Sequence, residues 1–149
     1  MERQQKQITL TGEQILALFQ EEKAKLEAIT RQLNSVQAVL TEVLLAEESV
    51  KELVKENFGG SILVNLGSGI FVEANIADAK KLKKSLAGSV ALEAQPEEVL
   101  EELKKRKENA QKTLELFLRD QEKIYTNLNN LSRVISAAQA QAARTGRKN

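Results

Sequence analysis

Few residues in this chain have the types and the spacing that a catalytic or ligand-binding site requires. Gly67-Ser68-Gly69 has the form of part of a phosphate-binding loop, but neither a third glycine nor a Gly-Lys-Ser/Thr segment follows it. These residues therefore predict a hairpin turn. The acidic pairs are neighbours within helical sequence, which indicates solvated surface and no pocket: Glu21-Glu22, Glu47-Glu48 and Glu97-Glu98.

The chain contains no cysteine and no histidine. This composition excludes disulfides, thiol nucleophiles, Cys/His zinc sites and acid–base catalysis by imidazole. We therefore expect no enzyme activity, no catalytic residues, no metal and no cofactor. The net charge of +1 over 149 residues also argues against a protein that coats nucleic acid or an anionic membrane.

Targeting signals are equally scarce. No apolar run approaches the roughly 20 residues of a membrane span, and residues 1–7 lack the apolar core of a signal peptide. The basic residues Arg144, Arg147 and Lys148 indicate a solvated helix end more than a nucleic-acid-binding arm. We expect a single domain of a soluble, cytoplasmic protein.

The first third of the chain predicts a helix over residues 11–57. Thr11 and Gln14 have the form of a capping box, and no Pro or Gly occurs from Glu13 to Asn57. Apolar residues recur with alternating steps of three and four, the pattern of a coiled-coil strand. Ten of twelve positions in this seam are apolar: Ile15, Phe19, Glu22, Leu26, Ile29, Leu33, Val36, Leu40, Val43, Glu47, Val50 and Val54.

The last third repeats this pattern over residues 96–145. Pro96 suits the first position of a helix, and the acids that follow it suit the positive end of the helix dipole. Ten of the twelve seam positions are again apolar: Leu100, Leu103, Lys107, Ala110, Leu114, Phe117, Gln121, Ile124, Leu128, Leu131, Ile135 and Ala138. Two seams of equal length joined by a short insert predict an antiparallel hairpin of helices.

Facing residues of this helical hairpin should have numbers that sum to about 154. Glu47 then lies level with Lys107, and the two charges either pair or reach water independently. Gln121 should face Leu33, which offers no polar partner. Glu22 should lie level with Ser132, so that the next residue, Arg133, is its one candidate counter-charge.

Residues 61–94 change to the alternation typical of two β-hairpins. Ile62 to Leu66 and Ile70 to Ile76 alternate around the Gly-Ser-Gly turn, and Lys81 to Leu86 and Val90 to Ala94 alternate around Ala87-Gly88. Isolated hairpins are marginal in water and expose unpaired edges. We therefore expect hairpins from several subunits to join into one sheet or barrel. The nearby lysines, Lys80, Lys81, Lys83 and Lys84, either protect an edge or dock an acidic partner.

The free ends of the two helices carry more apolar side chains than a narrow seam buries. The first helix and its preceding segment contribute Ile8, Leu10, Ile15, Leu16, Leu18 and Phe19. The second helix offers Val134 and Ile135 followed by many small alanines, which would leave the larger groups incompletely covered. Fraying and burial against a neighbouring subunit are alternatives, but we favour an interaction site.

The order helix, two hairpins, helix resembles the alpha class of prefoldin subunits, since beta-class subunits carry one hairpin. The segment from Ile62 to Val72, ILVNLGSGIFV, is similar to the family's first hairpin, although Asn65 stands where the family commonly has proline. The segment from Ser85 to Leu92 resembles the second hairpin.

This resemblance implies an ATP-independent co-chaperone, a hexamer of two alpha and four beta subunits whose hairpins form a β-barrel. It implies that coiled-coil tips capture non-native clients and pass them to a group II chaperonin. The client-binding residues would be Ile8, Leu10, Ile15, Leu16, Leu18, Phe19, Val134 and Ile135. The oligomerisation residues would be Ile62, Val64, Leu66, Ile70, Phe71, Val72, Leu86, Val90 and Leu92. A self-assembling filament is the alternative for such a chain.

Overall fold

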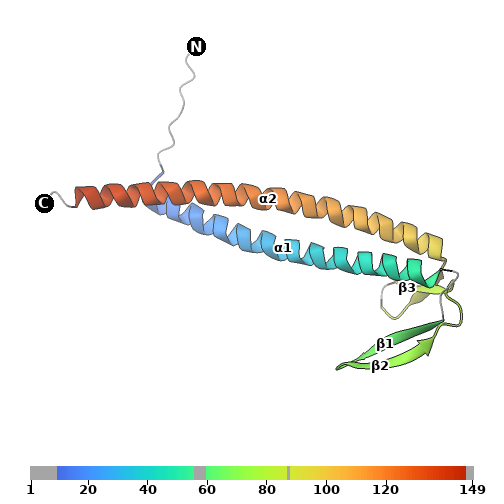
Figure 1. Ribbon diagram of the computed structural model, residues 1–149. Coiled ribbons are helices and arrows are strands. Elements are labelled where there is room, and N and C mark those ends of the chain that lie inside the picture. Colours follow the sequence, from blue (N-terminus) through green and yellow to red (C-terminus); the bar gives the residue numbers. More distant parts are fainter. Residues whose placement is uncertain (1–9, 56–59, 87, 147–149) are drawn as a thin grey trace, which may run out of the picture. The chain divides into compact units, whose positions relative to one another are not determined.

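Two long helices flank two β-hairpins in the computed structural model, which describes residues 10–55, 60–86 and 88–146 (Figure 1). The elements in chain order are α1 (Gly12–Leu53), β1 (Ser61–Gly67), β2 (Ile70–Asn75), β3 (Leu82–Ser85), β4 (Ala91–Ala94) and α2 (Pro96–Thr145). The predicted fold class is confirmed. Helix α1 ends earlier than position 57, because the chain turns at Val54 and Lys55; residues 56 and 57 lie outside the described residues.

Both helices begin as their sequences predict. The Gln14 backbone N–H donates to Thr11 Oγ1 at 3.3 Å, and the Thr11 N–H donates to Gln14 Oε1 at 2.9 Å. This reciprocal capping box satisfies two donors that the first turn of α1 would otherwise leave without partners. In α2 the buried Pro96 takes the first position and Glu97 and Glu98 lie in the first turn.

The described residues form two compact units. The first joins α1 up to Ser35 with α2 from Leu114 onward, and the second comprises Val36–Thr113. In each unit the helices pair through the predicted seam. All twelve residues of the first seam, which ends at Val54 just beyond α1, are buried or half-buried, and of the twelve residues in the second seam only Ala138 is exposed. The coiled-coil periodicity therefore correctly predicted which side chains leave water.

The core of the second unit extends beyond the helices to one hairpin. Val43, Val50 and Leu103 form its buried cluster. Leu82 at the start of β3 packs against this cluster, as do Ala46, Val99 and Leu100. The root of the β3–β4 hairpin is thus covered by its own helices and needs no second subunit there.

The β1–β2 hairpin has an apolar face and a mixed face. Ile62 pairs with Ala74 and Val64 with Val72, so these four side chains share one face. On the other face Leu63 pairs with Glu73, and Asn65 pairs with Phe71. The predicted oligomerisation residues therefore divide between the faces, because Phe71 lies opposite to Val72.

The turn of this hairpin depends on its two glycines. A bulge shifts the register between Asn65 and Gly67, and the chain then takes positive φ at Gly67 (99°), Ser68 (50°) and Gly69 (78°). Glycine adopts such angles without steric cost. Asn65 Oδ1 accepts a hydrogen bond from the Gly67 N–H at 2.8 Å, which fixes the bulge.

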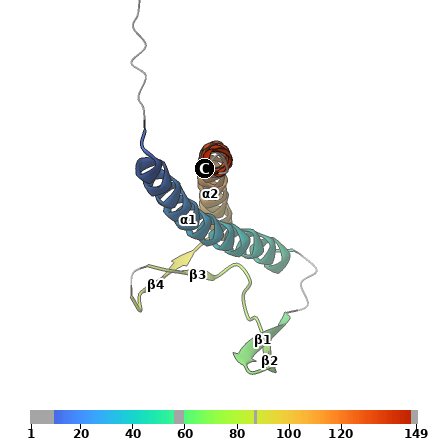
Figure 2. The same ribbon diagram turned by 90° about the vertical axis from the view of Figure 1, so that its left-hand side faces the viewer.

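The β3–β4 hairpin is a separate two-stranded sheet (Figure 2). Leu82 pairs with Ala94 and Lys84 with Leu92, and the Leu86 N–H donates to the Val90 carbonyl at 2.9 Å. These side chains share one face, as the alternation predicted. Leu82 and Ala94 are covered at its root, whereas Leu86, Val90 and Leu92 are exposed.

Candidate functional site

An apolar notch of about 180 Å³ lies where α1 begins beside the last part of α2. Four predicted client-binding residues meet in its lining: Ile15, Leu16, Val134 and Ile135. Leu16 is 51% exposed and Val134 is also exposed, whereas Ile15 and Ile135 are half-buried. The notch thus presents large aliphatic side chains to water without covering them, an arrangement typical of an interaction site.

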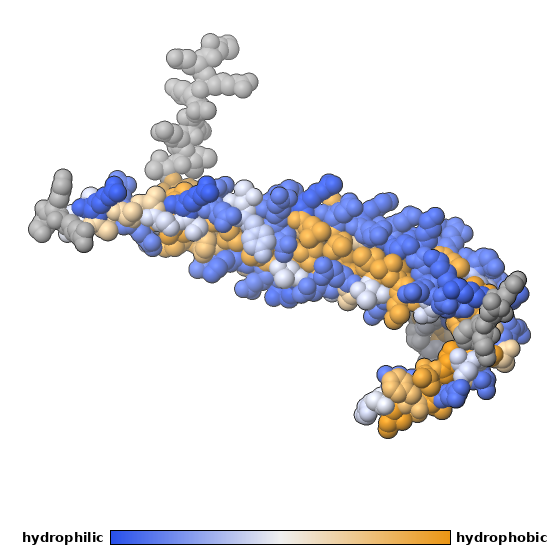
Figure 3. All heavy atoms as spheres, in the orientation of Figure 1, coloured by the Kyte–Doolittle hydropathy of each residue, from blue (hydrophilic) through white to orange (hydrophobic). Residues whose placement is uncertain are grey.

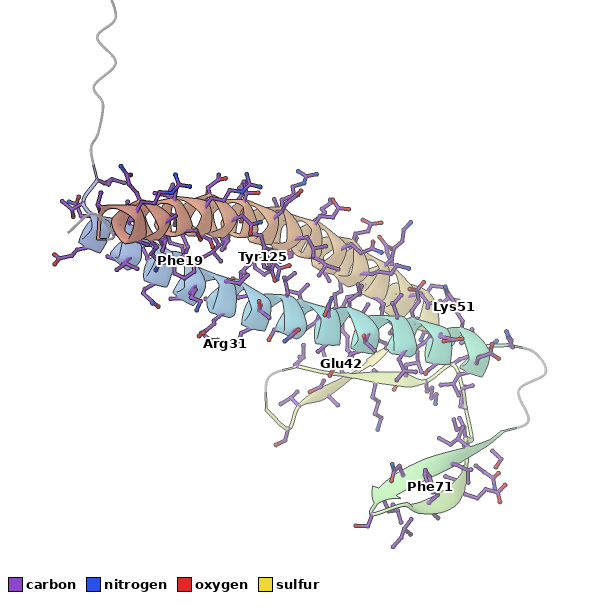
Figure 4. The ribbon with its side chains drawn as sticks, turned by 60° about the vertical axis from the view of Figure 1, so that its left-hand side comes forward. Phe19, Arg31, Glu42, Lys51, Phe71 and Tyr125 are labelled. Carbon is purple, nitrogen blue, oxygen red and sulfur yellow. The ribbon has the colours of Figure 1, made fainter. Side chains whose placement is uncertain are left out.

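The remaining predicted residues lie outside this lining. Leu10 and Leu18 are exposed, Phe19 is half-buried in the seam, and Ile8 lies outside the described residues. The Lys23 Nζ is 5.4 Å from the centroid of the Phe19 ring, a distance suited to a cation–π contact. Figure 4 shows that Phe19 belongs to α1, and Tyr125, an exposed aromatic, to α2.

The list of sequence-predicted residues omitted three members of the lining. Gly12 and Gln139 were not predicted, and Ala138 was predicted as a seam residue and as one of the small residues near the helix end, but not as a client-binding residue. Gln139 follows Ile135 by four residues and therefore lies on the same face of α2. A Cβ on Gly12 would meet no atom within 4 Å, so the notch is open beside that residue. Helical spacing from Ile135 could have found Gln139.

Two sequence expectations about polar seam residues of the first unit are wrong. Glu22, 9% exposed, accepts hydrogen bonds from Asn127 Nδ2 at 3.1 Å and from Lys25 Nζ at 2.9 Å, and not from Arg133. Gln121 Nε2 donates to Thr30 Oγ1 at 3.4 Å, so it does have a polar partner. In the expected register the numbers of facing residues sum to about 154. The observed partners, Glu22 with Asn127 and Thr30 with Gln121, have numbers that sum to 149 and 151, so the register of the two helices differs from the expected one here.

These bonds keep the charge of Glu22 favourable inside the seam. The Lys25 ammonium first, and the Asn127 amide second, hold the pKa of the Glu22 carboxyl below its usual value, against the opposing effect of desolvation. The seam of the first unit is therefore not purely apolar. Its buried carboxylate has partners on both helices, Lys25 on α1 and Asn127 on α2.

In the second unit an ion pair fastens the β3–β4 hairpin to α2. Lys84 Nζ lies 3.0 Å from Glu102 Oε2, and Glu102 also binds Arg106 one turn further along. Lys84 first, then Arg106, lowers the pKa of the Glu102 carboxyl. Lys84 thus anchors the hairpin to α2, a structural role that the sequence analysis did not predict. The other three lysines of the predicted group, Lys80, Lys81 and Lys83, are exposed.

The β1–β2 hairpin exposes many large hydrophobic side chains to water. Figure 3 shows hydrophobic side chains gathered over it. Leu63 is 71% exposed, and most of the predicted oligomerisation residues are exposed as well: Val64, Leu66, Ile70, Phe71, Val72, Leu86, Val90 and Leu92. Ile62 is half-buried. An isolated hairpin with such apolar surface is marginal in water, so this surface is a candidate for burial by a partner.

No group of three or more metal-ligating side chains occurs within residues 10–55, 60–86 and 88–146. Over the same ranges, neither helix carries a stretch that is apolar enough to cross a bilayer.

Comparison with known proteins identifies the family. A family model described as prefoldin subunit matches residues 22–141, most of the chain. The chain belongs to the prefoldin family. Within that family it resembles proteins named prefoldin subunit alpha, so the resemblance seen in the sequence is confirmed.

Two relatives named prefoldin subunit alpha show the extent of this similarity. A prefoldin subunit alpha from Methanococcoides burtonii is 30% identical over 101 residues, which cover 68% of this chain and 73% of that protein. Another from Methanosarcina barkeri is 34% identical over 104 residues, which cover 68% and 72% respectively.

Solved prefoldin structures share the fold. The crystal structure of the prefoldin beta subunit from Thermococcus strain KS-1 has a TM-score of 0.60 at 18% identity and covers 83% of this chain and 88% of its own. The cryo-EM structure of filamentous PFD from Methanocaldococcus jannaschii also has a TM-score of 0.60 at 18% identity, with coverage of 76% and 94%. These similarities support the fold at a level of identity too low to carry function.

Proposed function

We propose that this prefoldin subunit is part of an ATP-independent co-chaperone that captures non-native proteins at the notch between the helix ends and delivers them to a group II chaperonin. The open apolar notch is the observation that supports capture most directly. It offers Leu16 and Val134 to any apolar side chain, with almost no polar surface in its lining.

Weak apolar contacts suit the capture of many unrelated clients. Burial of one aliphatic side chain contributes about 1.5–3 kcal/mol, which corresponds to roughly tenfold or more in affinity. A single contact of that size holds a client briefly, whereas several subunits acting together hold it firmly because the contacts become intramolecular. Clients bound in this way can be released without nucleotide hydrolysis.

We further propose that the hairpins join this chain to beta-class subunits in a hexamer of two alpha and four beta subunits. The barrel would bury Ile62, Val64, Leu66, Ile70, Phe71, Val72, Leu86, Val90 and Leu92. The exposure of nearly all of these side chains in the single chain supports this role. The helices would remain free to hold clients.

The test compares how well assembled complexes suppress aggregation of a denatured client. The double variant Leu16→Ser/Val134→Ser, which replaces the two exposed large side chains of the lining, should weaken suppression while the size of the complex stays unchanged. Leu45→Ser is the matched control, because Leu45 is 64% exposed on α1 but lies outside the notch lining. Equal suppression by the double variant and the wild type would refute the assignment of client capture to this site.

A structural role as a filament is the second candidate, favoured by the similarity to the filamentous PFD of Methanocaldococcus jannaschii. Exposed hairpins that pair head to tail would propagate without closing. Size measurement of the purified chain separates the two: a closed small oligomer supports the chaperone, and an open series of polymers supports the filament.

A further inference from the structure

We propose that the hydrogen bond between the buried Glu22 and Asn127 sets the register in which the two helices of the first unit pair, and that this register builds the notch. Glu22 and Asn127 are then positioning residues for client capture, although neither lines the notch. The inference deepens the proposed function and rests on it for the consequence to clients. The register itself is a property of the chain and is tested without a client.

The apolar seam alone leaves the register of the first unit open. Its apolar residues recur every three or four positions, so a slip of one helix by one turn brings apolar positions opposite apolar positions again. Single polar residues inside a seam resolve this ambiguity in coiled coils, at some cost in stability. The seam of the first unit contains two such residues, Glu22 and Gln121.

Both polar residues bond across the helices in nearly the same register. Asn127 Nδ2 donates to Glu22 Oε2 at 3.1 Å, and Gln121 Nε2 donates to Thr30 Oγ1 at 3.4 Å. The residue numbers of these partners sum to 149 and 151. The bond to Glu22 is the stronger determinant, because its acceptor is a charged group that is only 9% exposed, whereas the bond from Gln121 is long and exposed.

The notch is built in this same register. Its lining residues lie at positions 12–16 of α1 and 134–139 of α2, so the centres of the two sets sum to about 150. In the register expected from the sequence, with sums of about 154, Ile15 would lie level with Gln139 and Leu16 with Ala138. The large aliphatic side chains that α2 contributes would then lie about one turn away, and the notch would be lost in its present form.

A slip to the expected register would break the bond to Glu22. One turn of helix is about 5.4 Å long, so Asn127 would leave the carboxylate that it now contacts at 3.1 Å. Arg133, the cation expected near Glu22 in that register, is exposed and lies two residues from the seam positions on either side, on the face of α2 away from the seam. The buried carboxylate would lose its partner on α2, a cost that a seam matched equally well in both registers does not offset.

Distances between spin labels measure the register directly. The chain has no cysteine, so Glu27→Cys on α1 and Gln141→Cys on α2 give two labelling sites, both exposed and both in the first unit. The labelled full-length chain is diluted with unlabelled chain so that pulsed electron paramagnetic resonance reads distances within one chain. Without further substitution we expect one distance, and a slip to the expected register should add a component roughly 5 Å shorter.

Two substitutions should release the register while they change stability in opposite directions. Glu22→Leu completes the apolar seam and should keep or raise the melting temperature. Asn127→Ala leaves the buried carboxylate without its partner on α2 and should lower the melting temperature. Both variants should show the shorter component. A single unchanged distance in either variant would overturn the proposal.

Two further variants serve as controls for the register. Glu22→Gln keeps an oxygen that accepts a hydrogen bond from Asn127, so it should keep the single distance. Glu21→Leu adds the same apolar side chain at the exposed neighbouring position, outside the seam, and should keep it as well. The shorter component in Glu22→Gln would show that the hydrogen bond does not set the register.

The consequence for clients has its own readout. Reduced, carboxymethylated α-lactalbumin serves as a permanently unfolded probe for the assembled complex. Glu22→Leu should weaken binding of this probe about twofold if the two registers are equally populated, because half of the notches are then lost. Unchanged binding by a variant that shows the shorter distance would overturn the positioning role, and with it the notch as the capture site. An unshifted distance would instead overturn the register assignment and leave the proposed function standing.

Discussion

Lys107 Nζ on α2 donates a hydrogen bond of 2.6 Å to Glu47 Oε2 on α1, although the two residues lie 60 positions apart in the sequence. Their side chains are only 24% and 13% exposed, and Glu47 also binds Lys51 at 2.6 Å. The two charges that interrupt the apolar seams therefore neutralise one another, as the first of the two sequence hypotheses held. Loss of either partner would leave a charge largely removed from water.

This pair predicts a specific loss of stability in acid. Lys107, and then Lys51, lowers the pKa of the Glu47 carboxyl from its ordinary 4.5 to about 2 in the folded chain. The folded state therefore favours the ionised carboxylate, so the stabilisation is complete above about pH 4.5 and is lost as the pH falls to about 2. Thermal unfolding followed by circular dichroism should show a steeper fall in this window for the wild type than for Glu47→Gln.

The neighbouring Glu48 provides the matched control for the acid experiment. Glu48 is exposed, and the structure shows no ion pair to it within the described residues. Glu48→Gln should follow the wild-type curve. Identical slopes for the wild type and Glu47→Gln would contradict the pairing.

Leu33 tests the seam of the first unit. Its side chain is 5% exposed, and Leu33→Ala should lower the free energy of unfolding by about 2–5 kcal/mol because it removes buried methyl groups and leaves a cavity. Leu45 is 64% exposed, so Leu45→Ala should change it by no more than about 0.5 kcal/mol. Urea unfolding measures both, and losses of similar size would show that the seam does not carry the stability.

Val72 tests the proposed barrel. It lies exposed on the apolar face of the β1–β2 hairpin, next to its partner Val64. Val72→Asp should abolish assembly with beta subunits, since a barrel interior would have to desolvate the carboxylate. Phe71 belongs to the same hairpin (Figure 4), but the strand pairing places it on the mixed face, so it is a less direct probe of that interior.

Analytical ultracentrifugation gives the oligomeric state in the Val72 experiment. Leu45→Asp introduces the same charge at an exposed leucine of α1 and should assemble normally. Circular dichroism should show equal helix content in both variants, because neither position lies in the helical seam. Normal assembly of Val72→Asp would show that this face is not buried between subunits.

The helices were predictable because a stripe of period three and four fixes which residues face a partner helix. The glycines and the alternation within each strand likewise predicted the two hairpins. Periodicity alone could not predict the contacts of Glu22 and Gln121. A long polar side chain bonds to whichever group lies within its reach, so a small change in helix register alters its partner.

Contacts between hairpin and helix also escaped the sequence analysis. Leu82 packs on the Val43 cluster and Lys84 binds Glu102. These contacts depend on how the chain turns between β2 and β3, which alternation within a strand does not encode. The notch was predicted in part: the excess of apolar residues indicated Leu16 and Val134, but Gly12 and Gln139 of its lining carry no apolar side chain that such a pattern would reveal.

Assembly is the central claim, and native mass spectrometry of the chain mixed with a prefoldin beta subunit tests it most directly. We predict a hetero-oligomer that contains two copies of this chain and four beta subunits, formed through the exposed hairpins. Separate masses for the two unmixed proteins, or polymers of this chain alone, would contradict the account.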